Sequence, residues 1–138
     1  MRLSDFLRTW EGHADRVLID APCTGLGTVR RNPWVKSNVS EEDVDRLSQV
    51  QHSVLDRYAR LVKPGGRLVY ATCTLLEKEN EEVVGWFLST HAQFSLLSAP
   101  DLIRAHGVLL ASASPYLTLL PSETGTDGFF AAALVRNA

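Results

Sequence analysis

Cysteine is scarce in this sequence: only Cys23 and Cys73 occur in 138 residues. Two cysteines cannot form the disulfide framework that holds small secreted domains together. No uninterrupted apolar run approaches the roughly 18 residues of a membrane helix. The first residues also lack the charged-then-apolar order of a secretory signal. The sequence therefore predicts a cytoplasmic protein with reduced thiols and no membrane segment.

An excess of basic residues is also missing. The chain has 14 Lys and Arg residues against 16 Asp and Glu residues, which gives a formal net charge of −2. A free-standing nucleic-acid-binding protein usually has a strong basic excess. Any contact with RNA must therefore be local or depend on another domain. The 4 histidines have no ligand spacing with one another or with the thiols, so no metal site is predicted.

What the sequence does contain is two apolar runs that each end in a turn with a cysteine. The length and the 45% hydrophobic content suit one domain with a real core. One strand is predicted at Val17–Ile19, before Cys23, and another at Leu68–Thr72, before Cys73. Reactive groups collect outside the carboxyl ends of neighbouring strands in an open α/β sheet. If the two strands are neighbours, Asp20, Cys23 and Cys73 converge on one pocket.

The remaining elements alternate in a way that is typical of an α/β fold. Ser40 is the expected N-cap of a helix, and residues 63–66 (Lys-Pro-Gly-Gly) are expected to stop that helix and turn the chain. A second helix is predicted at 77–90, with strands at 94–97 and 129–135; residues 20–33 and 121–128 are predicted loops, and 101–114 is ambiguous. This order predicts parallel strands early and an antiparallel pair at the end.

Three motifs carry a resemblance to a known family. DAPCTGLGTVRRNP, at 20–33, resembles the fourth motif of S-adenosylmethionine-dependent RNA 5-methylcytosine methyltransferases of the ribosomal RNA methyltransferase B, or Sun, type. LVYATCTLLEKENEEVV, at 68–84, resembles their sixth motif, and PSETGTDGFFAAAL, at 121–134, resembles their closing strand. The resemblance implies a partial Rossmann-like class I methyltransferase fold, made of strands four to seven with flanking helices and an antiparallel last pair.

The resemblance covers only the carboxyl-terminal half of a catalytic domain. Nothing in residues 1–138 resembles the family's Gly-rich cofactor loop, its ribose-binding acidic residue or its separate RNA-binding domain. Gly65 and Gly66 follow a helix instead of opening one, so they lack the context of a dinucleotide-binding loop. The first strand is then expected to expose an edge. That edge could pair with a second copy or with a complementing amino-terminal half.

The resemblance also implies a covalent mechanism. Carbon 5 of cytosine is a poor nucleophile until a thiolate adds to carbon 6, which is nucleophilic catalysis. Cys73 occupies the position of that nucleophile, and Cys23 the position implicated in product release. Asp20 is expected to face the nitrogen 3 edge of the pyrimidine and, with Pro22, to contact S-adenosylmethionine. The candidates for contacts with RNA phosphates are Arg30, Arg31 and Lys36.

Each assignment has a plainer competitor. A single buried cysteine is often a small core residue, Asp20 at a strand end can cap a turn, and a basic stretch can be a solvated surface. A chain without the cofactor loop is alternatively a catalytically incomplete fragment or subunit. A thiol redox or cysteine-hydrolase activity is a third hypothesis, weakened because the sequence has no Cys-x-x-Cys pattern and marks no histidine as a paired base.

Overall fold

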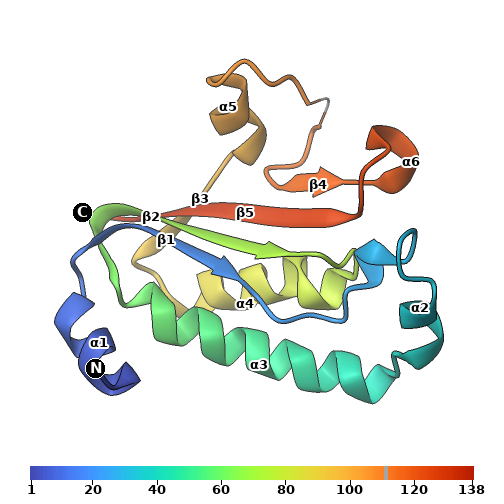
Figure 1. Ribbon diagram of the computed structural model, residues 1–138. Coiled ribbons are helices and arrows are strands. Elements are labelled where there is room, and N and C mark those ends of the chain that lie inside the picture. The colour runs from blue at the N-terminus through green and yellow to red at the C-terminus, as the bar shows by residue number, and fades with distance from the viewer. Residues whose placement is uncertain (111) are drawn as a thin grey trace.

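The computed structural model, which describes residues 1–110 and 112–138, has one mixed sheet with helices on both faces (Figure 1). Its strands are β1 (Ala14–Asp20), β2 (Val62–Thr72), β3 (Phe94–Leu97), β4 (Leu117–Leu119) and β5 (Phe129–Arg136). Its α-helices are α1 (Leu3–Trp10), α2 (Trp34–Asn38), α3 (Glu41–Ala59), α4 (Glu81–Thr90), α5 (Ala99–Arg104) and α6 (Pro121–Thr124). Two short 3-10 helices are η1 (Leu26–Thr28) and η2 (Glu77–Glu79).

The strand order is β1-β2-β5-β3, and β4 pairs with the first residues of β5. β1 and β2 are parallel, with Asp20 opposite Ala71, whereas β5 runs antiparallel to both β2 and β3. Both predictions, an α/β fold and an early parallel pair followed by antiparallel strands, are confirmed. Because β1 and β2 are parallel neighbours, the loops that follow them leave the sheet at the same end. β1 is an edge strand, and the exposed fraction of its Leu18 side chain is 70%.

The core lies between the sheet and the two helices below it in Figure 1, α3 and α4. The buried side chains include Leu55 and Phe87 from these helices and Leu68, Tyr70 and Phe130 from the sheet. The predicted N-cap of α3 is confirmed: the Ser40 hydroxyl accepts a hydrogen bond from the N–H of Asp43, and the Asp43 carboxylate accepts one from the Ser40 N–H. This reciprocal capping fixes where the longest helix begins.

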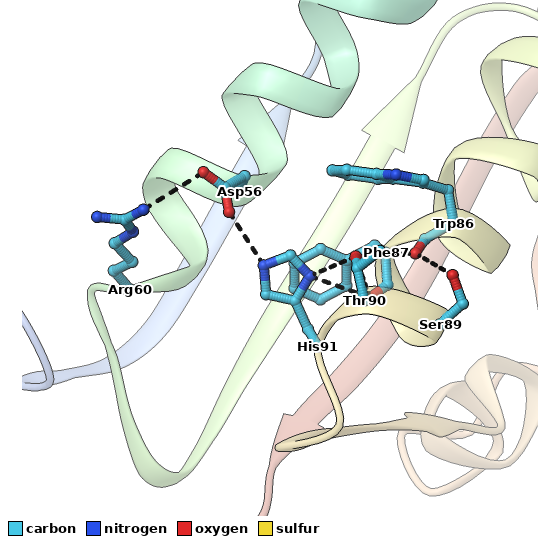
Figure 2. Close-up of polar contacts among 7 residues, drawn as sticks. All are labelled: Asp56, Arg60, Trp86, Phe87, Ser89, Thr90 and His91. Atoms are coloured by element: carbon cyan, nitrogen blue, oxygen red, sulfur yellow. Dashed lines mark hydrogen bonds and ion pairs between the residues drawn. The ribbon is translucent and has the colours of Figure 1, made fainter.

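A cluster of polar and aromatic side chains joins the end of α3 to the end of α4 (Figure 2). The His91 ring stacks on Phe87, with ring centroids 4.1 Å apart, and its Nε2 lies 3.1 Å from Oδ1 of Asp56. Arg60 lies 3.6 Å from the other oxygen of the same carboxylate. These contacts tie the two helices together and so hold them against one face of the sheet.

The expected stop at Lys63–Gly66 is wrong in its placement. α3 already ends at Ala59, and Pro64 and Gly65 lie within β2. Ala14 pairs with Val62 but Arg16 pairs with Arg67, so extra residues bulge out of β2. Proline has no N–H for the ladder, and Gly65 has a φ of 76° that suits glycine, so both residues fit a bulge.

The predicted helix at 77–90 is interrupted. The backbone of Asn80 has φ −115° and ψ −95°, which is not helical, and it separates η2 from α4. The two predicted loops each contain a short helix, η1 and α6, and the ambiguous 101–114 segment contributes to α5; residue 111 lies outside the described residues. β4 was not predicted, because three residues are too few to show a period. None of the helices in the described part of the chain has both the length and the apolar character to cross a membrane.

Candidate functional site

The structure brings the two cysteines together at the carboxyl end of the parallel pair. Cys23 lies in the loop after β1 and Cys73 in the loop after β2, and their Sγ atoms are 3.4 Å apart. Both cysteines are free thiols and both are partly buried. Two residues that lie 50 positions apart in the sequence thus form one thiol pair.

The closing motif packs against the same two loops. The N–H of Gly27 donates to the carbonyl oxygen of Cys73 at 2.9 Å, and the N–H of Gly128 donates to the carbonyl oxygen of Gly27 at 2.7 Å. A β-carbon at Gly27 would clash with Gly128 and with the Cys73 carbonyl oxygen. Only glycine allows this close approach of the two backbones. The three motifs of the resemblance therefore meet at one place.

The pKa of the Cys23 thiol is raised to about 12, first by burial and then by its hydrogen bond with Cys73. Removing a thiol from water disfavours the charged thiolate. Cys23 therefore remains protonated at neutral pH, and its sulfur lies within hydrogen-bonding distance of the Cys73 sulfur.

Asp20 and Pro22 lie on either side of the strand end. Asp20 is the last residue of β1, is exposed, and sits opposite Ala71 in the sheet register; Pro22 is also exposed. Among the described residues, no hydrogen bond or ion pair joins the Asp20 carboxylate to either thiol. The structure thus places Asp20 and Cys73 at the same end of two neighbouring strands, without a direct polar contact.

The three basic residues proposed from the sequence have different surroundings in the structure. The Arg31 Nε atom lies 2.6 Å from Oδ2 of Asp127, and Arg30 donates to the carbonyl oxygen of Gly125. Both arginines are exposed but are held by the loop of the closing motif. Lys36 lies on α2 and is exposed.

Sequence reasoning missed a buried polar group beneath the thiols. Glu79 and Asn80 are 0% and 2% exposed, and Gln51 from α3 is fully buried beside them. The Glu79 carboxylate accepts hydrogen bonds from Thr24 and Gln51. In the sequence, Glu79 looks like one of several acidic residues at the start of the predicted helix at 77–90. No periodic signal marks them, because the break in the helix at Asn80 changes which residues face inward.

The chain matches the family model for the 16S rRNA methyltransferase RsmB/F over residues 4–135. A probable ribosomal RNA small subunit methyltransferase B from Bacillus subtilis is 43% identical over 121 residues, which is 84% of this chain and 26% of that protein. The chain therefore belongs to the RsmB/F methyltransferase family. It spans about a quarter of the length of the curated relatives it matches.

Solved structures agree on the fold. A methyltransferase homologue from Pyrococcus horikoshii is 33% identical, with a TM-score of 0.68 over 88% of this chain and 39% of its own. The crystal structure of NSun6 from the same organism, determined with SFG, is 26% identical, with a TM-score of 0.79 over 100% of this chain and 34% of its own. The partial Rossmann-like methyltransferase fold predicted from the sequence is thereby confirmed.

Proposed function

We propose that this chain is the carboxyl-terminal half of the catalytic domain of an RNA cytosine-5 methyltransferase that acts on ribosomal or transfer RNA. The observation that carries the proposal is the thiol pair: Cys23 and Cys73 lie 3.4 Å apart at the carboxyl ends of neighbouring parallel strands. Membership of the RsmB/F family and relatives named as methyltransferases of small-subunit ribosomal RNA support this substrate class.

In the proposed mechanism Cys73 is the nucleophile. Its thiolate adds to carbon 6 of cytosine, and carbon 5 then becomes electron-rich enough to take a methyl group. Loss of the carbon 5 proton and expulsion of the Cys73 sulfur release the product. We assign Cys23 to that release, since burial raises its pKa and keeps a proton on a sulfur 3.4 Å from Cys73, where it can hydrogen-bond to the departing sulfur. Asp20 faces the nitrogen 3 edge of the ring and offsets charge that develops there.

S-adenosylmethionine supplies the electrophilic methyl group when it is bound. Asp20 and Pro22 fit one side of its site, because both are exposed at the strand end beside the thiol loop, as open α/β sheets place their ligands. We assign these two residues to the cofactor and Arg30, Arg31 and Lys36 to RNA phosphates. A cytoplasmic location follows from these partners and from the reduced state that the thiols need.

We further propose that this half is completed by pairing along the edge of β1. That edge is unpaired within the described residues, and Leu18 beside it is 70% exposed, which is unusual for a leucine in the middle of a strand. The complementing partner is an amino-terminal half with the cofactor loop; self-association of two copies is the alternative. Without that partner the chain would be a catalytically incomplete fragment.

The test of the mechanism is covalent trapping. RNA that contains 5-fluorocytosine is offered, with S-adenosylmethionine, to a domain reconstituted from this chain and an amino-terminal half. Fluorine at carbon 5 blocks the last elimination, so the enzyme stays bound to the RNA. The native chain should give an adduct that resists denaturing electrophoresis, and Cys73→Ala should give none. An adduct that survives in Cys73→Ala would remove Cys73 from its role.

Whether the chain needs a partner to bind the cofactor is tested separately, by calorimetric titration with S-adenosylmethionine. The chain alone should show no binding at micromolar concentrations, and addition of the amino-terminal half should restore it. Micromolar binding by the chain alone would contradict the proposal that it needs a partner.

The 3.4 Å separation of the sulfurs also suits a second candidate, a thiol redox pair. That function requires the disulfide to persist at the potential of the cytosol. Thiol titration in a glutathione buffer of cytosolic potential distinguishes the two. A stable Cys23–Cys73 disulfide would favour the redox function, and free thiols would favour the methyltransferase.

A further inference from the structure

Two consecutive buried residues, Glu79 and Asn80, hydrogen-bond to the loops that carry the thiol pair. Neither is solvated: their exposed fractions are 0% and 2%. Burial of a carboxylate carries a large desolvation penalty unless hydrogen bonds compensate for it. The hydrogen bonds of these two side chains therefore indicate which parts of the structure they stabilise.

Gln51 holds the peptide group before Cys23, and Glu79 holds the one after it. Its Oε1 accepts from the N–H of Thr24 at 2.9 Å, and its Oε2 accepts from the Thr24 hydroxyl at 2.7 Å. The Gln51 amide nitrogen lies 3.2 Å from the same carboxylate and donates to the carbonyl oxygen of Pro22 at 2.9 Å. Residues 22 and 24 are thus both fixed by one buried network, with Cys23 between them.

Asn80 holds the residues on either side of Cys73 in the same way. Its Oδ1 accepts from the Thr72 hydroxyl at 2.5 Å, and its Nδ2 donates to the carbonyl oxygen of Thr74 at 2.9 Å. The Thr74 hydroxyl lies 3.2 Å from that of Thr24, which links the two loops directly. Tyr70 also donates from its hydroxyl to the Glu79 carbonyl oxygen at 2.7 Å, so β2 anchors this dipeptide.

We propose that the Glu79–Asn80 dipeptide is a positioning element that sets the distance between the two sulfurs. The Glu79 side chain hydrogen-bonds to the Cys23 loop and the Asn80 side chain to the Cys73 loop. Because the two residues are joined by one peptide bond, the two loops are held at a fixed separation. Its catalytic importance depends on the proposed function, whereas its effect on the sulfur–sulfur distance does not. Neither residue touches the reacting atoms; both act through the loops that carry Cys23 and Cys73.

The rate of disulfide formation between the two thiols serves as the measure of their proximity. Diamide, an azo oxidant, accepts two electrons and two protons as the two thiols become one disulfide. The assay uses the full chain at a temperature well below its unfolding midpoint and follows the loss of free thiols and the mass of the Cys23–Cys73 peptide pair. A merely structural role for Glu79 would lower the unfolding midpoint and leave this rate unchanged.

Three variants separate the contributions. Glu79→Ala removes the hydrogen bonds that the carboxylate accepts from Thr24 and Gln51, and it should slow disulfide formation about 10-fold or more, because small displacements of reacting groups have large kinetic effects. Glu79→Gln keeps the shape of the side chain and an acceptor oxygen for the Thr24 N–H, and its amide can donate to the Thr24 hydroxyl, so it should stay within about threefold of the native rate on the same reasoning. Glu77→Ala, which changes an exposed residue of the same 3-10 helix, is the matched control and should leave the rate unchanged.

A native rate in folded Glu79→Ala would overturn the proposal. If that variant does not unfold cooperatively, Thr24→Val decides instead, since it removes the contacts of the hydroxyl with the carboxylate and with Thr74 and keeps the Thr24 N–H. It should slow the reaction at least about threefold, and an unchanged rate would refute the positioning role. An RNA adduct that persists in Cys73→Ala would refute the methyltransferase mechanism but not the positioning role, because the diamide assay uses no RNA.

Discussion

The backbones of Gly27 and Gly128 are in direct contact, and the N–H of Gly128 donates to the carbonyl oxygen of Gly27 at 2.7 Å. This contact joins the loop of Cys23 to the closing motif, while the Gly27 N–H reaches the Cys73 carbonyl oxygen. The side-chain-free face of Gly27 is therefore the point at which the three motifs are packed together. Its consequences can be measured without any assay of activity.

Gly27→Ala is expected to destabilise the chain. A methyl group there would lie 2.7 Å from the Cys73 carbonyl oxygen and would press on backbone that cannot move independently. Overpacking of this kind typically lowers the free energy of unfolding by about 1–3 kcal/mol. Gly85→Ala is the matched control, because a β-carbon at Gly85 in α4 meets open space; it should stabilise the helix by about 0.5–1 kcal/mol. Equal stabilities of the two variants in denaturant titrations would contradict the packing described.

The two thiols are expected to differ in reactivity. The pKa of Cys23 is raised to about 12, so very little Cys23 thiolate exists at pH 7–9, and only thiolates alkylate quickly. Iodoacetamide followed by peptide mapping should therefore label Cys73 well before Cys23. Cys73→Ser should speed the labelling of Cys23, since loss of the neighbouring thiol removes one cause of its raised pKa. Equal labelling of both residues in the native chain would be the opposite result.

Much of the fold could be predicted because the sequence carries periodic signals for it. The strand at 94–97 has the bounds that its apolar run predicts, and α3 begins at the residue after the predicted N-cap. The errors come from tertiary structure that overrides local signals. Pro64 and Gly65 look like a helix stop but lie within a strand, since the ladder tolerates them in a bulge. Short elements such as β4 exist only because β5 offers a partner.

The candidate site was predicted only in part, for a related reason. Cys23 and Cys73 follow apolar runs, so the order of strands and turns brings them to the same end of the sheet. The residues that hold them in place carry no comparable signal. Glu79 lies among four other charged residues in a stretch of six, and nothing in that composition distinguishes a buried carboxylate from a solvated one. Its role appears only when the packing of the loop against α3 is known.

Lys36, which is exposed on α2, is expected to contribute to RNA binding. No ion pair among residues 1–110 and 112–138 involves it, whereas Lys63, near the other end of the sheet, pairs with Asp15. If Lys36 contacts one phosphate of single-stranded RNA, Lys36→Ala should reduce the slope of log K against log salt by about 0.7. Lys63→Ala is the control and should leave the slope unchanged. Filter binding over a range of salt concentrations measures both, and equal slopes would remove Lys36 from the RNA-binding surface.

His52 is expected to make the stability of the chain depend on pH. Its ring stacks on Trp86, with centroids 4.1 Å apart, and burial lowers its pKa below the ordinary value of 6.5. As the pH falls, the unfolded chain therefore takes up a proton at His52 at a higher pH than the folded chain does. Stability from this residue is complete above pH 6.5 and is lost as the pH falls from 6.5 toward the lowered pKa. His52→Phe keeps an aromatic ring against Trp86 but cannot titrate, so its unfolding free energy should fall less than that of the native chain between pH 7 and pH 5. Identical losses in denaturant titrations at the two pH values would show that His52 is not responsible.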